Sequence, residues 1–317
     1  MKKLEQLTVN DSISKSMLAG IFGENLEFDK NLAPFTSFKT GGPAKYFYSA
    51  QTENDVIKTV KSAIQLKLPF FIIGGGSNLL ISDTGYDGLI IKIDVRGLKM
   101  LSDTEIECNA GEDLMSLVDF ATDNSLSGLE FASGIWGTVG GAIYGNAGAY
   151  GGEMKDIIKE ITLVDSAGKI KTIKPDYCRF GYRNSYLKET GEIILKATFK
   201  LRIGDCNTIK NKVQEILDIR TEKHPTKGNS AGCFFKNIPD TKEKFGKLPA
   251  GKLLEQIGAK NMSFGGASVY DKHANMIVNT GTATSKDIRA LADKLKEKVY
   301  KKFGIILEEE IIQVGKF

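Results

Sequence analysis

Two side chains in the second half of the chain could supply positive charge and a proton to a reacting group. Arg183 lies in the segment FGYRNSY (180–186), where a guanidinium among aromatic rings is suited to grip a carboxylate or stabilise an oxyanion. A surface arginine stacked on tyrosines is the commoner arrangement. Cys233 lies in SAGCFFKN (230–237), between small and aromatic residues. A thiol with an ordinary pKa of about 8.5 is mostly protonated at neutral pH, so it could act as an acid, although a buried core cysteine is more usual.

Three consecutive acids, Glu308 to Glu310, begin the last predicted strand. Strand alternation places Glu308 and Glu310 on one face and Glu309 on the other. Such a run usually forms a solvated edge, and one inward-facing carboxylate beside a site is the sharper alternative.

Two glycine-rich segments could bind phosphate or a flat ligand. In FIIGGGSNLL (71–80), a buried strand leads into three glycines whose backbone N–H groups suit a pyrophosphate, although a plain tight turn is possible. Leu79 stands where a GxGxxG motif needs its third glycine, which argues against a Rossmann fold. The segment Gly128–Gly152 contains nine glycines in 25 residues, with aromatic and aliphatic residues between them. This pattern favours an ordered ligand cradle over a linker, and the pair of segments favours dinucleotide binding.

A third glycine motif is a decoy. Residues 246–252, GKLPAGK, satisfy GxxxxGK, but Leu253 replaces the Ser or Thr that would hold Mg²⁺. A buried strand does not precede the motif and Pro249 lies inside it, so a P-loop is disfavoured.

Composition narrows the class of protein. The chain has 317 residues, 41% hydrophobic and 26% charged, with a net charge of +4 and no basic tract, which fits a soluble globular protein of two or three domains that binds no nucleic acid. Four separated cysteines and two histidines argue against a metal site, a disulfide scaffold or a Ser-His-Asp triad. The N-terminus lacks a signal peptide pattern and no apolar run could span a membrane, so we expect a cytoplasmic protein.

The predicted elements form an α+β block over residues 45–201 and a different unit beyond Gly204. The pattern predicts a short helical lead-in in 1–30. It also predicts helices in 52–68, 112–124, 209–223, 250–257 and from 285 to 303, where Ser285 is the expected cap. Strands are predicted at 45–50, 70–73, 88–94, 105–110, 161–165, 169–173, 192–201, 267–279 and 305–314.

The order of these segments resembles the UDP-N-acetylenolpyruvoylglucosamine reductase family, in its compact (type II) class. The resemblance runs from about Asn31 to Gly315 and rests on IIGGGSNLLISD (72–83), SGIWGTVGGAIYGNAGAYGGE (133–153), FGYRNSY, SAGCFFKN, AGKLLEQIG (250–258), GGASVYDKHANMIVN (265–279), ATSKDIRAL (283–291) and LEEEIIQVG (307–315). It implies an α+β fold, with an FAD-binding domain of the vanillyl-alcohol-oxidase/PCMH type and a smaller α+β substrate domain. The implied boundaries are a lead-in at 1–30, a two-lobed FAD domain at 31–204, a substrate domain at 205–303 and a returning strand at 304–317.

The resemblance also implies an activity and a site. NADPH would reduce FAD, and the flavin would reduce UDP-N-acetylglucosamine enolpyruvate to UDP-N-acetylmuramate for peptidoglycan synthesis, in a protein we expect to be monomeric. Arg183 and Glu310 correspond to the family's catalytic arginine and glutamate, and Cys233 to its proton donor. The implied substrate residues are Tyr182, Lys223, Asn237 and His273. The implied FAD residues are Gly74, Gly75, Gly76, Ser77, Asn78, Leu79, Ser133, Gly134, Gly137, Thr138, Gly140, Gly141, Asn146, Gly148 and Ala149.

The sequence departs from the family pattern at two positions. The proton donor is usually serine, whereas this chain has Cys233, which we expect to be sensitive to oxidation and alkylation. Trp136, the only tryptophan, stands where the family usually has proline. Another FAD-linked oxidase of the same fold and a non-catalytic nucleotide-binding protein are the competing hypotheses.

Overall fold

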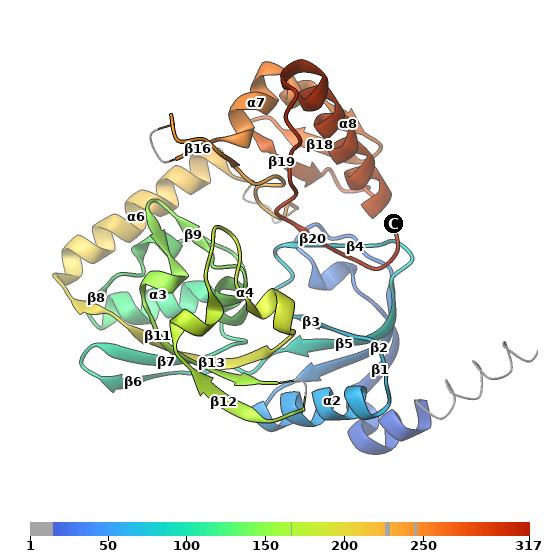
Figure 1. Ribbon diagram of the computed structural model, residues 1–317, viewed down its shortest axis with the longest axis vertical. Coiled ribbons are helices and arrows are strands. Elements are labelled where there is room, and N and C mark those ends of the chain that lie inside the picture. The colour runs from blue at the N-terminus through green and yellow to red at the C-terminus, as the bar shows by residue number, and fades with distance from the viewer. Residues whose placement is uncertain (1–14, 166, 226–228, 244–245) are drawn as a thin grey trace, which may run out of the picture.

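The computed structural model describes residues 15–165, 167–225, 229–243 and 246–317. Figure 1 shows two sheets in the lower part of the molecule and a smaller unit above them, built around α7 (Ala250–Gln256) and α8 (Ser285–Phe303). Among the described residues, no helix is long and apolar enough to cross a bilayer.

The first sheet has the order β1-β2-β5-β3, and only β1 runs antiparallel to its neighbour. The strands are β1 (Leu26–Asn31), β2 (Pro43–Ala50), β3 (Phe70–Ile73) and β5 (Tyr86–Ile93). Between β2 and β3 lies α2 (Glu53–Gln65), at whose N-terminus Thr52 and Asp55 form a capping box. The expected helical lead-in is present at 15–22, where Leu18 is fully buried, and its first 14 residues lie outside the described residues.

The second sheet is antiparallel throughout, with the order β12-β11-β13-β7-β6. Its strands are β6 (Leu98–Ser102), β7 (Glu105–Asn109), β11 (Ile158–Val164), β12 (Ile170–Ile173) and β13 (Ile193–Lys200). The helices α3 (Leu114–Asp123), α4 (Val139–Tyr144), α5 (Leu187–Thr190) and α6 (Cys206–Lys223) belong to this part of the chain. Short strand pairs are β8 (Leu126–Ser127) with β14 (Arg202–Ile203), and β9 (Gly148–Ala149) with β10 (Gly152–Glu153).

The upper unit is a small antiparallel sheet packed against α7 and α8. It contains β17 (Ser263–Phe264), β18 (Ala267–Tyr270) and β19 (His273–Asn279), and a separate pair, β15 (Ile238–Pro239) with β16 (Lys247–Leu248). The chain then returns to the first sheet region, where β20 (Ile312–Val314) pairs in parallel with β4 (Leu79–Ile81). Figure 1 shows this return as the red segment beside β4.

The buried side chains form three clusters that follow this division. The largest joins both lower sheets and includes Ile209 and Val213 of α6. A second fills the upper unit and takes in Phe38 and Leu80 from the lower part. The third covers the opposite face of the first sheet, where Val314 packs on it. The upper unit is therefore packed onto β4 and the loop that carries Phe38, and it is not merely tethered to the lower part.

Three predicted local features need correction. The glycine-rich segment contains a helix, α4, that begins at the N-cap Thr138, a feature that its glycine content concealed. The cap of α8 is Thr284 and not Ser285, because the Thr284 side chain accepts the N–H of Asp287. The last strand covers only 312–314, since in residues 305–311 only Glu309 pairs, through one isolated bridge with Phe235.

Candidate active site

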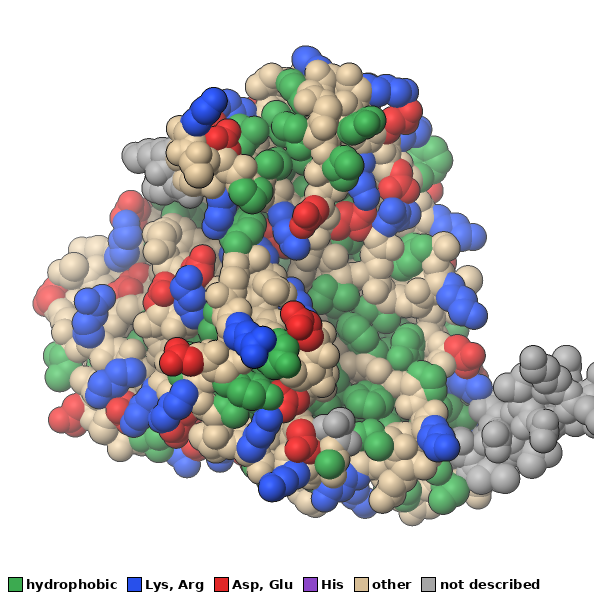
Figure 2. Space-filling model, viewed as in Figure 1, with side chains coloured by type: hydrophobic (Ala, Val, Ile, Leu, Met, Phe, Trp, Pro, Cys, Tyr) green, Lys and Arg blue, Asp and Glu red, His purple; other side chains and the backbone are tan. Residues whose placement is uncertain are grey.

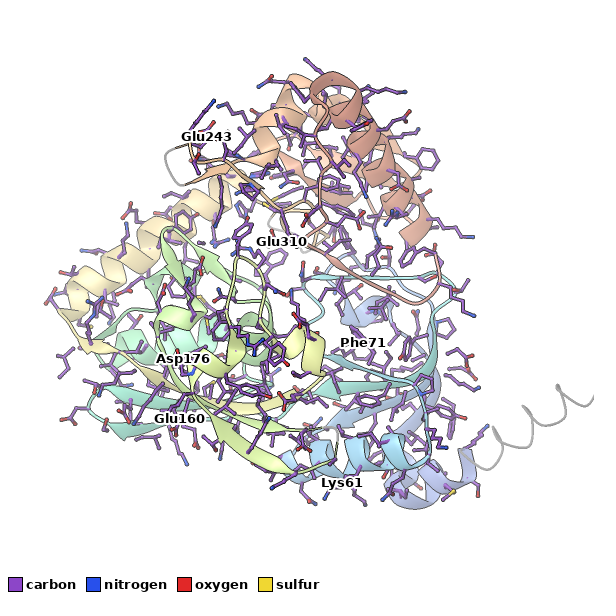
Figure 3. The ribbon with its side chains drawn as sticks, in the orientation of Figure 1. Lys61, Phe71, Glu160, Asp176, Glu243 and Glu310 are labelled. Carbon is purple, nitrogen blue, oxygen red and sulfur yellow. The ribbon has the colours of Figure 1, made fainter. Side chains whose placement is uncertain are left out.

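Arg183 and Glu310 meet although 127 residues separate them in the chain. The Nε of Arg183 donates to Oε1 of Glu310 over 2.6 Å, and the two side chains are 25% and 18% exposed. Figure 3 shows Glu310 at the junction between the upper unit and the two lower sheets. A short, largely buried ion pair at such a junction fixes the direction of the guanidinium.

Glu310 is positioned by a segment that is held from two sides. The N–H of Lys236 donates to the carbonyl of Glu308, and the N–H of Glu310 donates to the carbonyl of Phe234, both over 2.8 Å. On the other side, Asn78 Nδ2 donates to the carbonyl of Glu310 over 3.1 Å. The glutamate therefore bridges the Cys233 segment and the first glycine-rich loop.

The two neighbouring acids have different roles. Glu309 points to α8, where Arg289 and Lys296 lie 3.2 and 3.1 Å from its carboxylate. Glu308 is 75% exposed and pairs with Lys236. The predicted separation of Glu309 from Glu310 is confirmed, and Glu309 ties the segment to α8.

A tight turn presents Arg183. Gly181 and Asn184 bond each other through their backbones, and Arg183 adopts the left-handed conformation, with φ of 53°. The side-chain amide of Asn146 donates to the carbonyl of Gly181 over 2.9 Å. Burial tends to lower the pKa of Arg183, but the Glu310 carboxylate reverses this and the pKa is raised, so the guanidinium stays charged.

Burial acts differently on Glu310. It raises the pKa of the carboxyl group, and the charge of Arg183 opposes part of that rise. Glu310 therefore takes up a proton at a higher pH than an ordinary glutamate.

Cys233 is held beside this pair by Asn275. The Asn275 side chain bonds both backbone groups of Phe235, at 3.0 and 2.8 Å, and the backbone carbonyl of Asn275 accepts the N–H of Phe234. Burial, with a contribution from Glu310, raises the pKa of the Cys233 thiol to about 12, although Arg183 and Arg220 oppose this rise. The thiol keeps its proton at neutral pH, as a proton donor must. The expected sensitivity to alkylation stays a prediction, and the raised thiol pKa would slow the reaction because less thiolate is present.

The two glycine-rich loops lie against each other. A Cβ on Gly75 would be 2.9 Å from the Cα of Gly137, and one on Gly74 would be 2.3 Å from Oγ1 of Thr138. The hydroxyl of Ser77 donates to the carbonyl of Trp136 over 2.8 Å. The two segments that the sequence linked to dinucleotide binding therefore form one backbone-lined cradle.

The cradle fits the pyrophosphate of FAD. Within the described part of the chain, no hydrogen bond uses the backbone N–H groups of Gly75, Gly76, Ser77 and Asn78. Unused N–H groups on glycine-rich backbone are the groups that phosphate oxygens accept from. In Figure 2, hydrophobic side chains gather in a hollow on the face below α8, where Figure 3 labels Phe71. The Phe71 and Tyr86 rings lie 6.3 Å apart, which suits a neighbouring flat ring.

Several residues implied as FAD ligands have their side chains committed to the fold. Ser133 donates to the carbonyl of Glu130 over 2.7 Å, and the Asn146 amide bonds Glu153 as well as Gly181. Leu79 is buried in β4. Gly140 is packed on Ala110, and Gly148 on Glu153. These residues support the cradle, and any contact with FAD would come from their backbones.

A matched pair of glycines tests the close approach in the cradle. Gly76 and Gly191 share a left-handed conformation, with φ of 62° and 66°, but only a Cβ at Gly76 would clash, at 1.8 Å from the carbonyl oxygen of Phe35. We expect Gly191→Ala to lower the free energy of unfolding by about 1 kcal/mol, from backbone strain alone. Gly76→Ala should lower it by at least about 3 kcal/mol and abolish FAD retention. Equal losses in denaturant titrations of the two variants would contradict the close approach.

Of the four residues predicted to bind substrate, Tyr182 and Asn237 are in contact, and His273 lies beside His224, the residue that follows Lys223. The Tyr182 hydroxyl accepts the N–H of Asn237 over 3.3 Å, which links the lower sheets to the upper unit. The rings of His224 and His273 lie 5.9 Å apart. Lys223 is the last residue of α6 and is exposed. A Cβ on Gly251 would be 3.8 Å from His273, and Asn237 Oδ1 accepts the N–H of the adjacent Ala250 over 3.1 Å, so α7 begins between Asn237 and His273.

Several further residues of this region have no recognisable signal in the sequence. Lys247 places its Nζ 3.6 Å from the centre of the Tyr182 ring. Arg220 of α6 reaches the Cys233 region, and its charge acts on the thiol pKa. The segment Phe35–Ser37 forms a third wall of the cradle, where the N–H of Ser37 donates to the carbonyl of Gly76. In the sequence, only the polar pair Thr36-Ser37 and the turn pair Gly41-Gly42 could have indicated that this segment contributes to the cradle.

His224 makes stability depend on pH. Burial and the charge of Arg220 lower the pKa of His224 to about 4. Its neutral form is favoured in the folded state, so this contribution to stability is present above the ordinary histidine pKa of about 6.5 and is lost as the pH falls towards 4. We expect the melting temperature to drop less between pH 7 and pH 5 in His224→Gln than in the wild type. An identical drop in both proteins would contradict this assignment.

Two family models match the chain. Residues 44–174 match the FAD binding domain, and residues 224–314 match the C-terminal domain of UDP-N-acetylenolpyruvoylglucosamine reductase. The first match covers both glycine-rich segments of the cradle, and the second covers Cys233 and Glu310.

Curated relatives and a solved structure agree with these matches. The chain is 40% identical over 280 residues to the UDP-N-acetylenolpyruvoylglucosamine reductase of Caldanaerobacter subterraneus subsp. tengcongensis, covering 88% of this chain and 90% of that one. It is 37% identical to the reductase of Clostridioides difficile, covering 96% and 99%. The crystal structure of the Thermus caldophilus reductase superimposes with a TM-score of 0.77 at 29% identity, covering 92% and 98%. The chain therefore belongs to the UDP-N-acetylenolpyruvoylglucosamine reductase family.

Proposed function

We propose that this flavoprotein oxidoreductase uses NADPH to reduce UDP-N-acetylglucosamine enolpyruvate to UDP-N-acetylmuramate, a step in the supply of peptidoglycan precursors. The observation that carries the proposal is the meeting of Arg183, Glu310 and Cys233 beside the glycine cradle. Family membership and the FAD-binding match make the chain an FAD-dependent enzyme. FAD, when bound, supplies the hydride chemistry, from NADPH to the vinyl carbon of the substrate.

Arg183 is the group that would stabilise the negative charge. When the vinyl carbon gains a hydride, the π electrons of the C=C bond shift towards the neighbouring carboxylate. The enolate that forms needs a fixed cation. Arg183 is charged, partly buried and aimed by Glu310. A preorganised charge in a dry site is worth far more than the same charge in water.

Cys233 would complete the reduction. The thiol proton passes to the carbon that bears the carboxylate, which gives the lactyl ether and leaves a thiolate that regains a proton from solvent. The raised pKa ensures that a proton is available, and the Arg183 and Arg220 charges ease the transient thiolate.

Four residues would hold the rest of the substrate. Tyr182 and Asn237 span the junction between the lower sheets and the upper unit. His273 and Lys223 lie beyond the start of α7, and the exposed lysine suits the UDP phosphates. The proposed division of the chain is an FAD domain at 31–204, a substrate domain at 205–303 and a returning strand at 304–317. We further propose that the enzyme is monomeric and cytoplasmic, and that its product serves cell shape and cell division.

The test is turnover without oxygen. Once its flavin is reduced, the purified protein should continue to consume NADPH only when the enolpyruvyl sugar nucleotide is present, and it should do so equally well in the absence of O₂. An oxidase of the same fold would need O₂ and would consume no NADPH. A colourless protein that takes up no FAD would contradict both activities.

A further inference from the structure

We propose that Arg220 is a second substrate-binding guanidinium of the site and that it takes the carboxylate of the enolpyruvyl group. This inference rests on the proposed function. Arg220 lies in the last turn of α6, on a different element from Arg183. Its Nε is fully buried and has no hydrogen-bond partner among the described residues.

The surroundings hold the Arg220 side chain in place. Its guanidinium carbon lies 5.3 Å from the centre of the Tyr150 ring. A Cβ on Gly134 would approach its Cδ to 2.8 Å, so the arginine packs directly on the backbone of the second glycine-rich segment. The side chain is thus pressed between the cradle and an aromatic ring, an arrangement that fixes a guanidinium without using its N–H groups.

The charges around Cys233 do not balance. Arg183 is neutralised by Glu310, whereas no carboxylate of the described chain lies within ion-pair distance of Arg220. A partly buried cation without a counter-ion is unfavourable, because its hydration has been lost and nothing replaces it. An anion bound from solution would restore both the charge balance and the missing acceptor.

The position selects which anion this is. Arg183 is joined through Glu310 to the residue that follows Cys233, and Arg220 packs on Gly134 of the cradle. The effect of both charges on the Cys233 pKa agrees with this placement. Cys233 protonates the carbon that carries the carboxylate, and the carboxylate must then lie beside that thiol. The diphosphate is separated from this carbon by the sugar ring. Reduced flavin is the other source of negative charge that could face Arg220, and the experiment separates the two.

The experiment measures binding rather than turnover. The FAD-loaded, oxidised wild type, Arg220→Gln, Arg220→Lys and the exposed control Arg202→Gln are titrated with the enolpyruvyl sugar nucleotide and with UDP-N-acetylglucosamine, which lacks the carboxylate. The readout is the change in the flavin spectrum, or calorimetry where the spectrum does not respond. The flavin midpoint potential of each variant is measured without substrate.

Arg220→Gln should weaken the enolpyruvyl ligand about 10- to 100-fold, leave UDP-N-acetylglucosamine within about twofold, and leave the midpoint potential unchanged. Arg220→Lys keeps the charge but not the two parallel N–H donors of the guanidinium, so its affinity for the enolpyruvyl ligand should lie between those of the wild type and Arg220→Gln. If Arg220→Gln does not fold, Arg220→Lys provides the test. Equal weakening of both ligands, unchanged binding of both, or a lowered midpoint potential with unchanged binding would overturn the proposal. A wild type that binds neither ligand would instead contradict the proposed function.

Discussion

Cys233→Ala should accept electrons from NADPH at the wild-type rate and fail to pass them to the enolpyruvyl substrate. In the proposed reaction the thiol donates a proton only in the second half-reaction, because the hydride transfer from NADPH needs no acid at that position. We expect reoxidation of the flavin by substrate to slow by about 10²–10⁴-fold. Stopped-flow absorbance of the flavin, recorded separately for the two half-reactions, measures this split.

Cys233→Ser is the matched control for this variant. A hydroxyl has nearly the same size as the thiol and also carries a proton, and the surrounding Asn275 and Phe235 contacts are made by other residues. Cys233→Ser should therefore keep substantial activity. A Cys233→Ala protein that is reoxidised normally would exclude the thiol as the proton donor.

Arg183→Gln should slow the same half-reaction by about 10²–10³-fold, because one electrostatic contact to the developing charge is lost. The single-turnover rate of flavin reoxidation measures this loss. The matched control is Arg179→Gln, four residues earlier in the chain. Arg179 is exposed and lies 4.5 Å from the Tyr186 ring, the arrangement of a surface arginine stacked on a tyrosine. Arg179→Gln should change the rate by less than about twofold.

Glu310 offers a second view of the same contact. Glu310→Gln should lower the rate because Arg183 loses its partner, whereas Glu308→Gln, at an exposed carboxylate, should not. Because burial raises the pKa of Glu310, wild-type activity should fall on the acid side at a higher pH than an ordinary glutamate would dictate. If Arg183→Gln or Glu310→Gln left the rate of flavin reoxidation unchanged, the role proposed for that residue would be contradicted.

Local structure was largely predictable because its signals lie within a few residues of one another. The capping box of α2 can be identified from two residue types three positions apart, and the apolar faces of α3 and α8 from the helical spacing of apolar residues. The helix α4 was missed because Gly140 and Gly141 lie inside it, and such residues weaken a helix unless packing supports it. That packing is the close contact of Gly140 with Ala110, which no local pattern reveals.

The site was only partly predictable. Arg183, Cys233 and Glu310 were identified through the family resemblance, because nothing in local spacing indicates that residues 183 and 310 meet. Arg220 was missed because it lies on a helix with many charged residues, where an arginine is normally solvated. Only tertiary packing against Gly134 and Tyr150 distinguishes it.

The central claim is tested most directly by an anaerobic experiment on the wild-type protein, in two steps. NADPH should bleach the bound flavin, and the enolpyruvyl sugar nucleotide, added without O₂, should restore the flavin colour and yield one equivalent of the lactyl ether. A flavin that NADPH reduces but that regains its colour only when O₂ is admitted would contradict the account.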